Sequence, residues 1–171
     1  MGDGWITPGK PEEGIVGRTL LGLIGWIGLS FGAAAVGSLF RPGAWYFSLD
    51  KPVWTPPGWI FPPVWTALYA MMGIAAWLAW KERGWRGAAI PLSIFIVQLL
   101  LNAAWSWLFF GLHRPGLALL DIIALWIGIL ATVIAFWRVR PAAGILLIPY
   151  LAWVSFATVL NAEIWRRNPG A

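Results

Sequence analysis

Five long apolar runs dominate this sequence and restrict what it can fold into. They extend over residues 18–40, 61–80, 88–110, 117–137 and 142–165. A helix needs roughly 20 apolar residues to cross about 30 Å of hydrocarbon, and each run is near that length. Only 11% of the residues are charged and the mean hydropathy is +0.73, whereas soluble domains carry about 25% charged residues. The sequence therefore predicts an all-α membrane protein, a bundle of five transmembrane helices.

The polar breaks between the runs predict the domain organisation. Three of the breaks are expected to be tight turns, at residues 81–87, 111–116 and 138–141. The fourth break, at residues 41–60, is expected to be a longer loop. Short connections make consecutive helices antiparallel neighbours. We therefore expect one membrane domain at residues 18–167, a polar N-terminal tail at 1–17 that lies on the surface or is poorly ordered, and a short C-terminal tail at 168–171.

The charges indicate a lipid environment. The net charge is +5, and most Lys and Arg residues stand at the ends of apolar runs, where they suit lipid headgroups rather than nucleic acid. We expect no nucleic-acid partner. The chain has no cysteine, which excludes disulfides and thiolate metal sites, and we expect no metal site. A slight excess of basic residues on the N-terminal side favours a cytoplasmic N-terminus if the host is an inner membrane.

The stretch from Lys51 to Tyr69 is rich in tryptophan and proline. Proline fixes φ and lacks an amide donor, so the second helix should begin near Phe61, at the end of this proline-rich lead-in. Upstream, Trp54 should lie on a stiff loop at the membrane edge, where an indole is favoured. Trp65 follows about one turn into the helix, where its N–H needs a partner or a ligand. We expect an aromatic wall at the mouth of the bundle.

The third run contains polar side chains that would be costly in lipid. Gln98, Asn102 and Ser106 are four residues apart and share one helix face, next to Trp105. Together with Ser93 they are expected to point inward. Two alternatives stay open for this face: hydrogen bonds to other helices, or the wall of a cavity.

The first run carries glycines at helical spacing: Gly22, Gly25, Gly28 and Gly32. Glycine lets another helix or a flat molecule approach closely. The glycines therefore predict either packing within the bundle or a groove for a planar apolar ligand.

In the fourth run, Asp121 stands about one turn inside the apolar segment. An intramembrane carboxylate is either functional or, near a helix end, paired with a charged neighbour. We expect the second, with His113 or Arg114 as the partner.

The fifth run has one stripe of residues at helical spacing: Trp153, Phe156, Ala157, Leu160 and Asn161. The stripe suits the edge of an apolar pocket, and an ordinary seam between helices explains the periodicity equally well. Pro149 removes one backbone hydrogen bond and predicts a local kink.

Taken together, these motifs resemble the signature of the TspO/translocator protein family, bacterial type, whose members are also called tryptophan-rich sensory proteins and peripheral-type benzodiazepine receptors. The resemblance runs from the first apolar run to the last and preserves order and spacing. It rests on Lys51-Pro52, Trp54-Thr55-Pro56-Pro57, Phe61-Pro62, Trp65, Leu68-Tyr69, Gln98, Asn102, Trp105, Phe109-Phe110-Gly111, Pro149-Tyr150, Trp153, Phe156-Ala157-Thr158 and Leu160-Asn161.

The resemblance implies a homodimeric five-helix protein of a bacterial membrane, inner or outer, that binds porphyrins such as protoporphyrin IX or a haem-related tetrapyrrole and requires no cofactor. The family's pocket lies inside the bundle under the long first loop. Carried over by motif, its walls are Tyr46, Trp65, Asn102, Trp105, Trp153 and Ala157. The residue patterns add Trp54, Ser106 and Phe156 to this expected ligand-binding set. A porphyrin propionate is expected to reach Arg41 or Lys51.

Three functions remain as hypotheses. The preferred one is a tetrapyrrole sensor or regulator. The second is light- and oxygen-dependent porphyrin degradation, for which the resemblance implicates Trp65 and Trp153 as catalytic residues. The third is transport of porphyrin or sterol, although the chain shows no inverted repeat. Sterol binding is further disfavoured because the animal cholesterol motif needs a tyrosine where this chain has Ala162.

Overall fold

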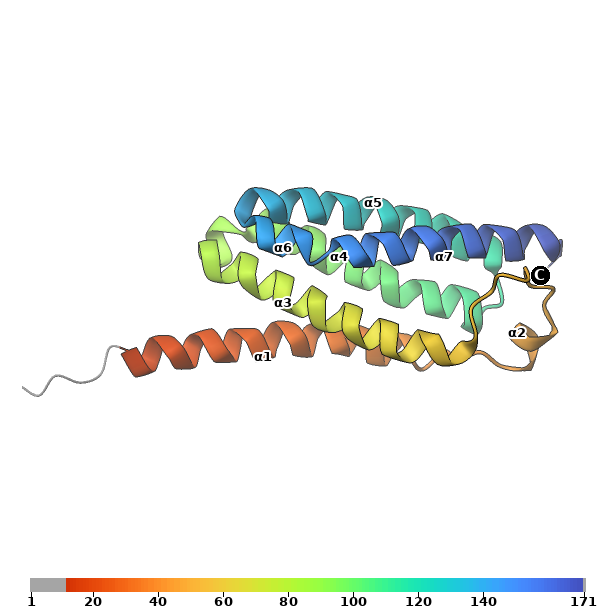
Figure 1. The fold of residues 1–171 in the computed structure, drawn as a ribbon, viewed down its shortest axis with the longest axis horizontal. Helices are drawn as coiled ribbons and strands as arrows, with labels where there is room; N and C mark the ends of the chain where they lie inside the picture. The colour runs from red at the N-terminus through yellow and green to blue at the C-terminus, as the bar shows by residue number, and fades with distance from the viewer. Residues whose placement is uncertain (1–11, 171) are drawn as a thin grey trace, which may run out of the picture.

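The structure, a computed structural model, describes residues 12–170 and consists of five long helices joined by short elements (Figure 1). The long helices are α1 (Glu12–Gly37), α3 (Phe61–Gly87), α4 (Ala89–Ser106), α5 (Pro115–Val139) and α7 (Ile148–Arg167). No strand occurs in the described part of the chain. Five helical stretches are long and apolar enough to cross a membrane. The predicted all-α five-helix fold is confirmed, and the protein is an integral multi-pass membrane protein.

Some helix boundaries differ from the prediction. Helix α1 begins at Glu12, six residues before the predicted start at Arg18, while residues 1–11 lie outside the described part of the chain. Helix α3 continues through residues 81–87, which were expected to form a turn. The chain breaks its helical path only at Gly84, with φ 64° and ψ −175°. Glycine adopts this conformation without a Cβ clash, so one residue is enough to redirect the chain.

The remaining elements lie at the ends of the long helices. They are α2 (Ala44–Ser48) and the 3₁₀-helix η1 (Gly58–Ile60) in the long loop, the π-helix η2 (Trp107–Gly111) after α4, and α6 (Pro141–Ile145) before α7. The break between α6 and α7 falls at Leu146 and Leu147, directly before Pro149. The structure thus bends the fifth crossing where the sequence predicts a kink.

The core is densely packed in the half of the bundle that lies toward Gly84. Its fully buried side chains include Met72, Ala75, Ala76, Ala79, Phe95 and Phe136. The alanines of α3 let neighbouring helices approach closely, and the rings of Phe95 and Phe136 stack at 5.8 Å across α4 and α5. Helix α1 packs along α3 and α4 at the edge of the bundle.

Most of the glycine face of α1 neither packs inside the bundle nor lines a groove, contrary to both predictions. Gly22 is covered by the ring of Trp80, but no heavy atom lies within 4 Å of the Cβ position at Gly25, Gly28 or Gly32. These three glycines therefore neither pack inside the bundle nor line a groove. Besides the contact of Gly22 with Trp80, helix α1 meets α3 at Ile27, which lies against Gly73.

The predicted partners of Asp121 are also wrong. Among the described residues no ion pair joins it to His113 or Arg114, and its Oδ2 atom is buried with no hydrogen-bond partner. His113 instead stacks on Trp45, with ring centroids 4.3 Å apart, in a turn where its own φ is +55°. Ser93, expected to point inward, is exposed near the start of α4.

Candidate functional site

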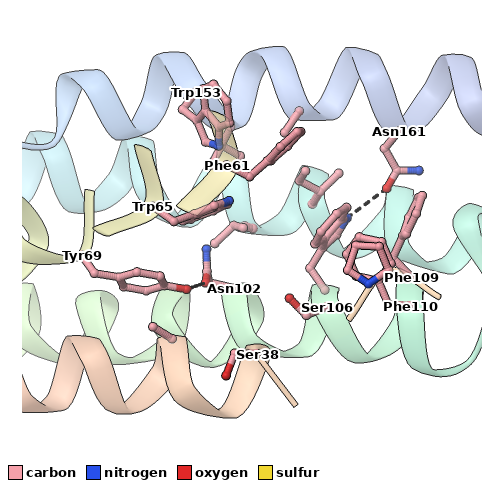
Figure 2. A pocket seen from close by; sticks show the side chains of 18 of the residues that line it. Ser38, Phe61, Trp65, Tyr69, Asn102, Ser106, Phe109, Phe110, Trp153 and Asn161 are labelled. Carbon is pink, nitrogen blue, oxygen red and sulfur yellow. Dashed lines mark hydrogen bonds between the residues drawn. The ribbon is translucent and has the colours of Figure 1, made fainter. Parts of the chain in front are cut away.

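A cavity of about 530 Å³ lies inside the half of the bundle that faces the long loop (Figure 2). Residues of α1, α3, α4, α5 and α7 line it, and the α2 segment of the loop contributes as well. Most of the lining is aromatic or aliphatic. Its volume falls in the range of about 300–1,000 Å³ that is typical of pockets for small organic ligands.

Two tryptophans from different crossings face this cavity. Trp65 comes from α3, just after the prolines that start the helix, and Trp153 comes from α7. Figure 2 shows both indole rings on the side of the cavity shared by α3 and α7. The edge of Phe61 meets Trp153 at 5.7 Å, and Trp65 lies 5.5 Å from Tyr69, so aromatic contacts hold both indoles in place. Neither indole N–H donates to a protein group within the described residues.

A buried polar chain forms the floor of the cavity. The Tyr69 hydroxyl donates to Asn102 Oδ1, and Asn102 Nδ2 donates to the Tyr150 hydroxyl at 2.9 Å. Tyr150 in turn donates to Gln98 Oε1 at 3.0 Å. Tyr69 and Asn102 line the cavity, whereas Gln98 and Tyr150 lie behind them. The two alternatives for the polar face of α4 therefore both apply: Gln98 links helices, and Asn102 links helices and also forms the cavity wall.

The π-helix at the end of α4 brings aromatic rings to the other side of the cavity. Trp105 stacks on Phe109 at 5.0 Å, and Phe110 stands edge-on to both. The Trp105 indole donates to Asn161 Oδ1 at 2.9 Å, and Asn161 Nδ2 donates to the Pro115 carbonyl at 2.8 Å. One amide thus joins α4, α5 and α7, and it holds Trp105 in a fixed orientation.

The long loop covers the end of the cavity that faces water. From α2, Tyr46 packs edge-on against Phe110 at 5.5 Å, and burial raises the pKa of its phenol, so the hydroxyl stays neutral. Lys51 does not reach toward the cavity as expected. Its ammonium donates to the carbonyls of Tyr46 at 2.7 Å and Leu49 at 3.0 Å and so caps α2.

The structure brings most of the predicted ligand-binding residues to one cavity. Those that line it are Tyr46, Trp65, Asn102, Trp105, Ser106, Trp153 and Ala157. Trp54 and Phe156 do not: Phe156 packs behind Trp153, and the half-exposed Trp54 packs on Phe156 at 5.8 Å. These two residues therefore support Trp153 from outside the cavity. The role of all nine residues in binding stays a prediction.

The contribution of α1 to the cavity wall was not predicted. Phe31, Ala34, Ala35 and Ser38 line the cavity on a face of α1 distinct from its exposed glycines. One aromatic residue among small ones forms no recognisable pattern in the sequence, so only the packing of α1 reveals this contribution. Tyr69 was also missed as a lining residue, although its position four residues after Trp65 places both on one helix face.

The chemistry of the site is that of an apolar pocket with a localised polar floor. No group of three or more His, Cys, Asp or Glu side chains able to hold a metal ion occurs among the described residues. The site offers aromatic faces for stacking, free indole N–H donors and the Tyr69–Asn102 pair. It therefore suits a flat, largely apolar organic ligand that carries a few polar atoms.

Comparison with known proteins gives consistent matches. The family model described as the TspO/MBR family matches residues 22–166. The chain is 45% identical over 157 residues to the tryptophan-rich protein TspO of Chlorobaculum tepidum, covering 89% of this chain and 99% of that protein. It is 42% identical over 142 residues to the protein CrtK of Rhodobacter capsulatus, covering 81% and 87%. It is 45% identical over 140 residues to the human translocator protein, covering 79% and 83%.

Proposed function

Because this chain belongs to the TspO/MBR family, we propose that it binds protoporphyrin IX and related flat hydrophobic ligands in its cavity, as a tetrapyrrole sensor or regulator in a bacterial membrane. The main support is that Trp65 and Trp153, from two separate crossings, line one cavity. Indole rings give a planar macrocycle large stacking surfaces at little cost in conformational entropy.

The polar groups of the site suit the edge of such a ligand. The free indole N–H of Trp65 can donate to a ligand oxygen, and the Tyr69 hydroxyl keeps lone pairs that can accept a hydrogen bond. A charged propionate favours the loop end, where Arg41 follows the cavity-lining end of α1 and its Nε donates to the Ser38 carbonyl at 3.1 Å. The Lys51 ammonium donates to three backbone carbonyls, whereas the Arg41 guanidinium uses only its Nε in this way and keeps further N–H donors, so Arg41 is the better candidate of the two.

Tryptophan fluorescence tests this proposal. Protoporphyrin IX should quench the emission of the purified protein in a saturable titration. Replacing Trp65 and Trp153 together by Phe should reduce both the quenching amplitude and the affinity, the latter by about fivefold, because each Phe offers a smaller stacking surface.

The matched control removes two indoles that lie outside the cavity, Trp107 and Trp137, which are 45% and 48% exposed. This double Phe variant should keep the wild-type affinity. An unchanged titration in the Trp65/Trp153 double variant would show that the ligand binds elsewhere.

A second candidate function is light- and oxygen-dependent degradation of the bound porphyrin. It is favoured by oxidisable side chains in mutual contact at the cavity, since Trp65 lies 5.5 Å from Tyr69 and 6.3 Å from Tyr150. Illumination in the presence of oxygen should then yield a distinct product at more than one equivalent per protein. A rate equal to that of free indole in detergent would dismiss it.

Transport is the less favoured alternative because of where the cavity lies. It occupies the loop half of the bundle, whereas the other half is filled by residues such as Ala76, Ala79 and Phe136 with 0% exposure. A cavity that is closed at one end by packed side chains suits ligand binding better than transport across the membrane. Porphyrin flux into sealed proteoliposomes above that of protein-free vesicles would contradict this.

We also propose that the protein is a homodimer, as its resemblance to the family implies. Its exposed apolar residues include several on α4 and α5, such as Leu100, Leu120 and Ile127. Light scattering of the protein in detergent should give twice the mass of one chain, and a monomer at all concentrations would contradict the proposal.

A further inference from the structure

The end of the cavity that faces water is closed by the long loop. Leu49 is only 9% exposed and belongs to a small buried apolar cluster with Phe109, Ala118, Leu160 and Ile164. Next to it, Asp50 and Asn168 form a reciprocal pair: the Asp50 amide donates to Asn168 Oδ1 at 3.0 Å, and Asn168 Nδ2 donates to the Asp50 carbonyl at 2.9 Å. Arg167 adds an ion pair with Asp50 at 3.6 Å. The loop is thus fastened to the end of α7.

Two lateral sides of the cavity are closed as well. Between α3 and α7, the contact of Phe61 with Trp153 forms an aromatic seal. Between α1 and α4, Ser106 Oγ lies 3.2 Å from the Cβ position of Gly37, so the Ser106 side chain packs against the end of α1 at that level. A little further on, the Phe40 ring covers Gly111, where an added Cβ would stand 2.8 Å from it. These contacts leave no room for a ligand to pass.

The side between α1 and α3 differs. These helices are in tight contact at mid-depth, where a Cβ on Gly73 would lie 2.7 Å from the Ile27 Cα. Toward the loop, several residues that line the cavity on this side have exposed side chains. They are Phe31 at 37% exposure, together with Ala35, Ser38 and Thr66. Exposed residues on two adjacent helices that also line the cavity indicate an opening between those helices.

We propose that this opening is a lateral doorway through which ligands pass between the lipid bilayer and the cavity. It lies between two membrane-crossing stretches, Gly17–Gly37 and Gly58–Gly87, so it faces lipid rather than water. Its rim is mostly small side chains, and Phe31, 6.1 Å from Tyr69, stands at its inner edge. The ligands it admits are molecules already dissolved in the membrane. This inference rests on the proposed function for its ligand, and it adds the source of that ligand.

Blocking the doorway after folding tests the proposal. The chain has no native cysteine, so Thr66→Cys gives a single thiol on the rim. A bulky thiosulfonate reagent on this cysteine, in bilayer nanodiscs, should slow both the association and the dissociation of protoporphyrin IX by about tenfold, because a blocked gate hinders passage in both directions. A reductant that releases the reagent should restore both rates.

Two control variants complete the experiment. Ala67→Cys places the same reagent on an exposed neighbour of Thr66 that does not line the cavity, and it should leave both rates unchanged. A disulfide between Asp50→Cys and Asn168→Cys locks the loop and should also leave them unchanged. If the locked loop slows binding and the modified Thr66→Cys variant does not, ligands enter from water under the loop and the doorway is wrong.

A readout without porphyrin separates this inference from the proposed function. Ala157→Cys puts a thiol in the cavity wall, where a lipid-soluble pyrene maleimide can label it from the bilayer. Adding Thr66→Trp should slow this labelling by about tenfold, and adding Ala67→Trp should not. If protoporphyrin IX fails to bind but Thr66→Trp still slows labelling, the doorway stands and the proposed ligand fails. Equal labelling in the two Trp variants would overturn the doorway.

Discussion

Asn102 is a polar residue in an apolar crossing that serves two purposes at once. It accepts a hydrogen bond from Tyr69, donates one to Tyr150 and is itself only 5% exposed. The sequence identified it because an amide in lipid needs partners, but the partners are phenols on helices far away in the chain. Lys51 is the opposite case, because its charge next to the predicted pocket serves the backbone of α2.

Replacing Asn102 by Leu should destabilise the protein by about 2–3 kcal/mol, because the buried Tyr69 hydroxyl then loses its acceptor and the buried Tyr150 hydroxyl loses one of its two hydrogen bonds. Thermal unfolding in detergent measures the change. Tyr69→Phe removes only one of the two bonds and should cost less. Ser93→Ala, at an exposed position of the same helix, is the matched control and should change stability by less than about 0.5 kcal/mol. Equal losses for Asn102→Leu and Ser93→Ala would mean that the polar chain contributes nothing to stability.

At the scale of elements, the glycines of α1 and α3 show how position decides the role of a residue type. Gly73 of α3 lies under the backbone of α1 at Ile27, whereas Gly28 of α1 faces outward with open space around it. Helix α1 has more glycines than α3, yet the glycine that lies against the backbone of the other helix is on α3. Periodicity indicated that a glycine face exists, but it does not say which neighbour, if any, covers it.

Gly73→Ala and Gly28→Ala form a matched pair that tests this assignment. The added methyl at residue 73 would meet Ile27 and should cost about 1–3 kcal/mol through overpacking. The same methyl at residue 28 meets no atom of the chain and should change the free energy of unfolding by less than about 1 kcal/mol. Thermal unfolding of both variants in one detergent decides the matter. If residue 28 proves the more sensitive of the two, a contact outside this chain covers the glycine face.

For the whole molecule, the two ends of the bundle differ slightly in their number of basic residues, six at the Gly84 end and five at the loop end within the described part of the chain. The end at Gly84 carries six basic residues in the described part of the chain, with Glu82 lying 3.7 Å from Arg140: Arg18, Lys81, Arg83, Arg86, Arg138 and Arg140. At the loop end, Glu163 and Asp50 pair with Arg166 and Arg167 and offset part of the positive charge. Basic residues in short loops stay preferentially in the cytoplasm.

In a bacterial inner membrane, the Gly84 end should therefore face the cytoplasm. Single cysteines in the cysteine-free chain test this: Phe47→Cys in the exposed long loop should react with a membrane-impermeant maleimide from outside the cell. Arg86→Cys should react only after the membrane is permeabilised. The reverse pattern would place the N-terminus outside.

The sequence alone determined that this is a five-helix membrane protein and that Trp65, Asn102, Trp105 and Trp153 face inward, because crossing length and the cost of polar atoms in lipid can be read locally. Only the tertiary structure decided which faces of the helices meet. It placed Phe31 and Ala35 in the cavity wall, moved Trp54 and Phe156 behind it, and left Gly28 on the surface. A contact between two helices depends on the surfaces of both, and the sequence of one helix does not specify the surface that packs against it.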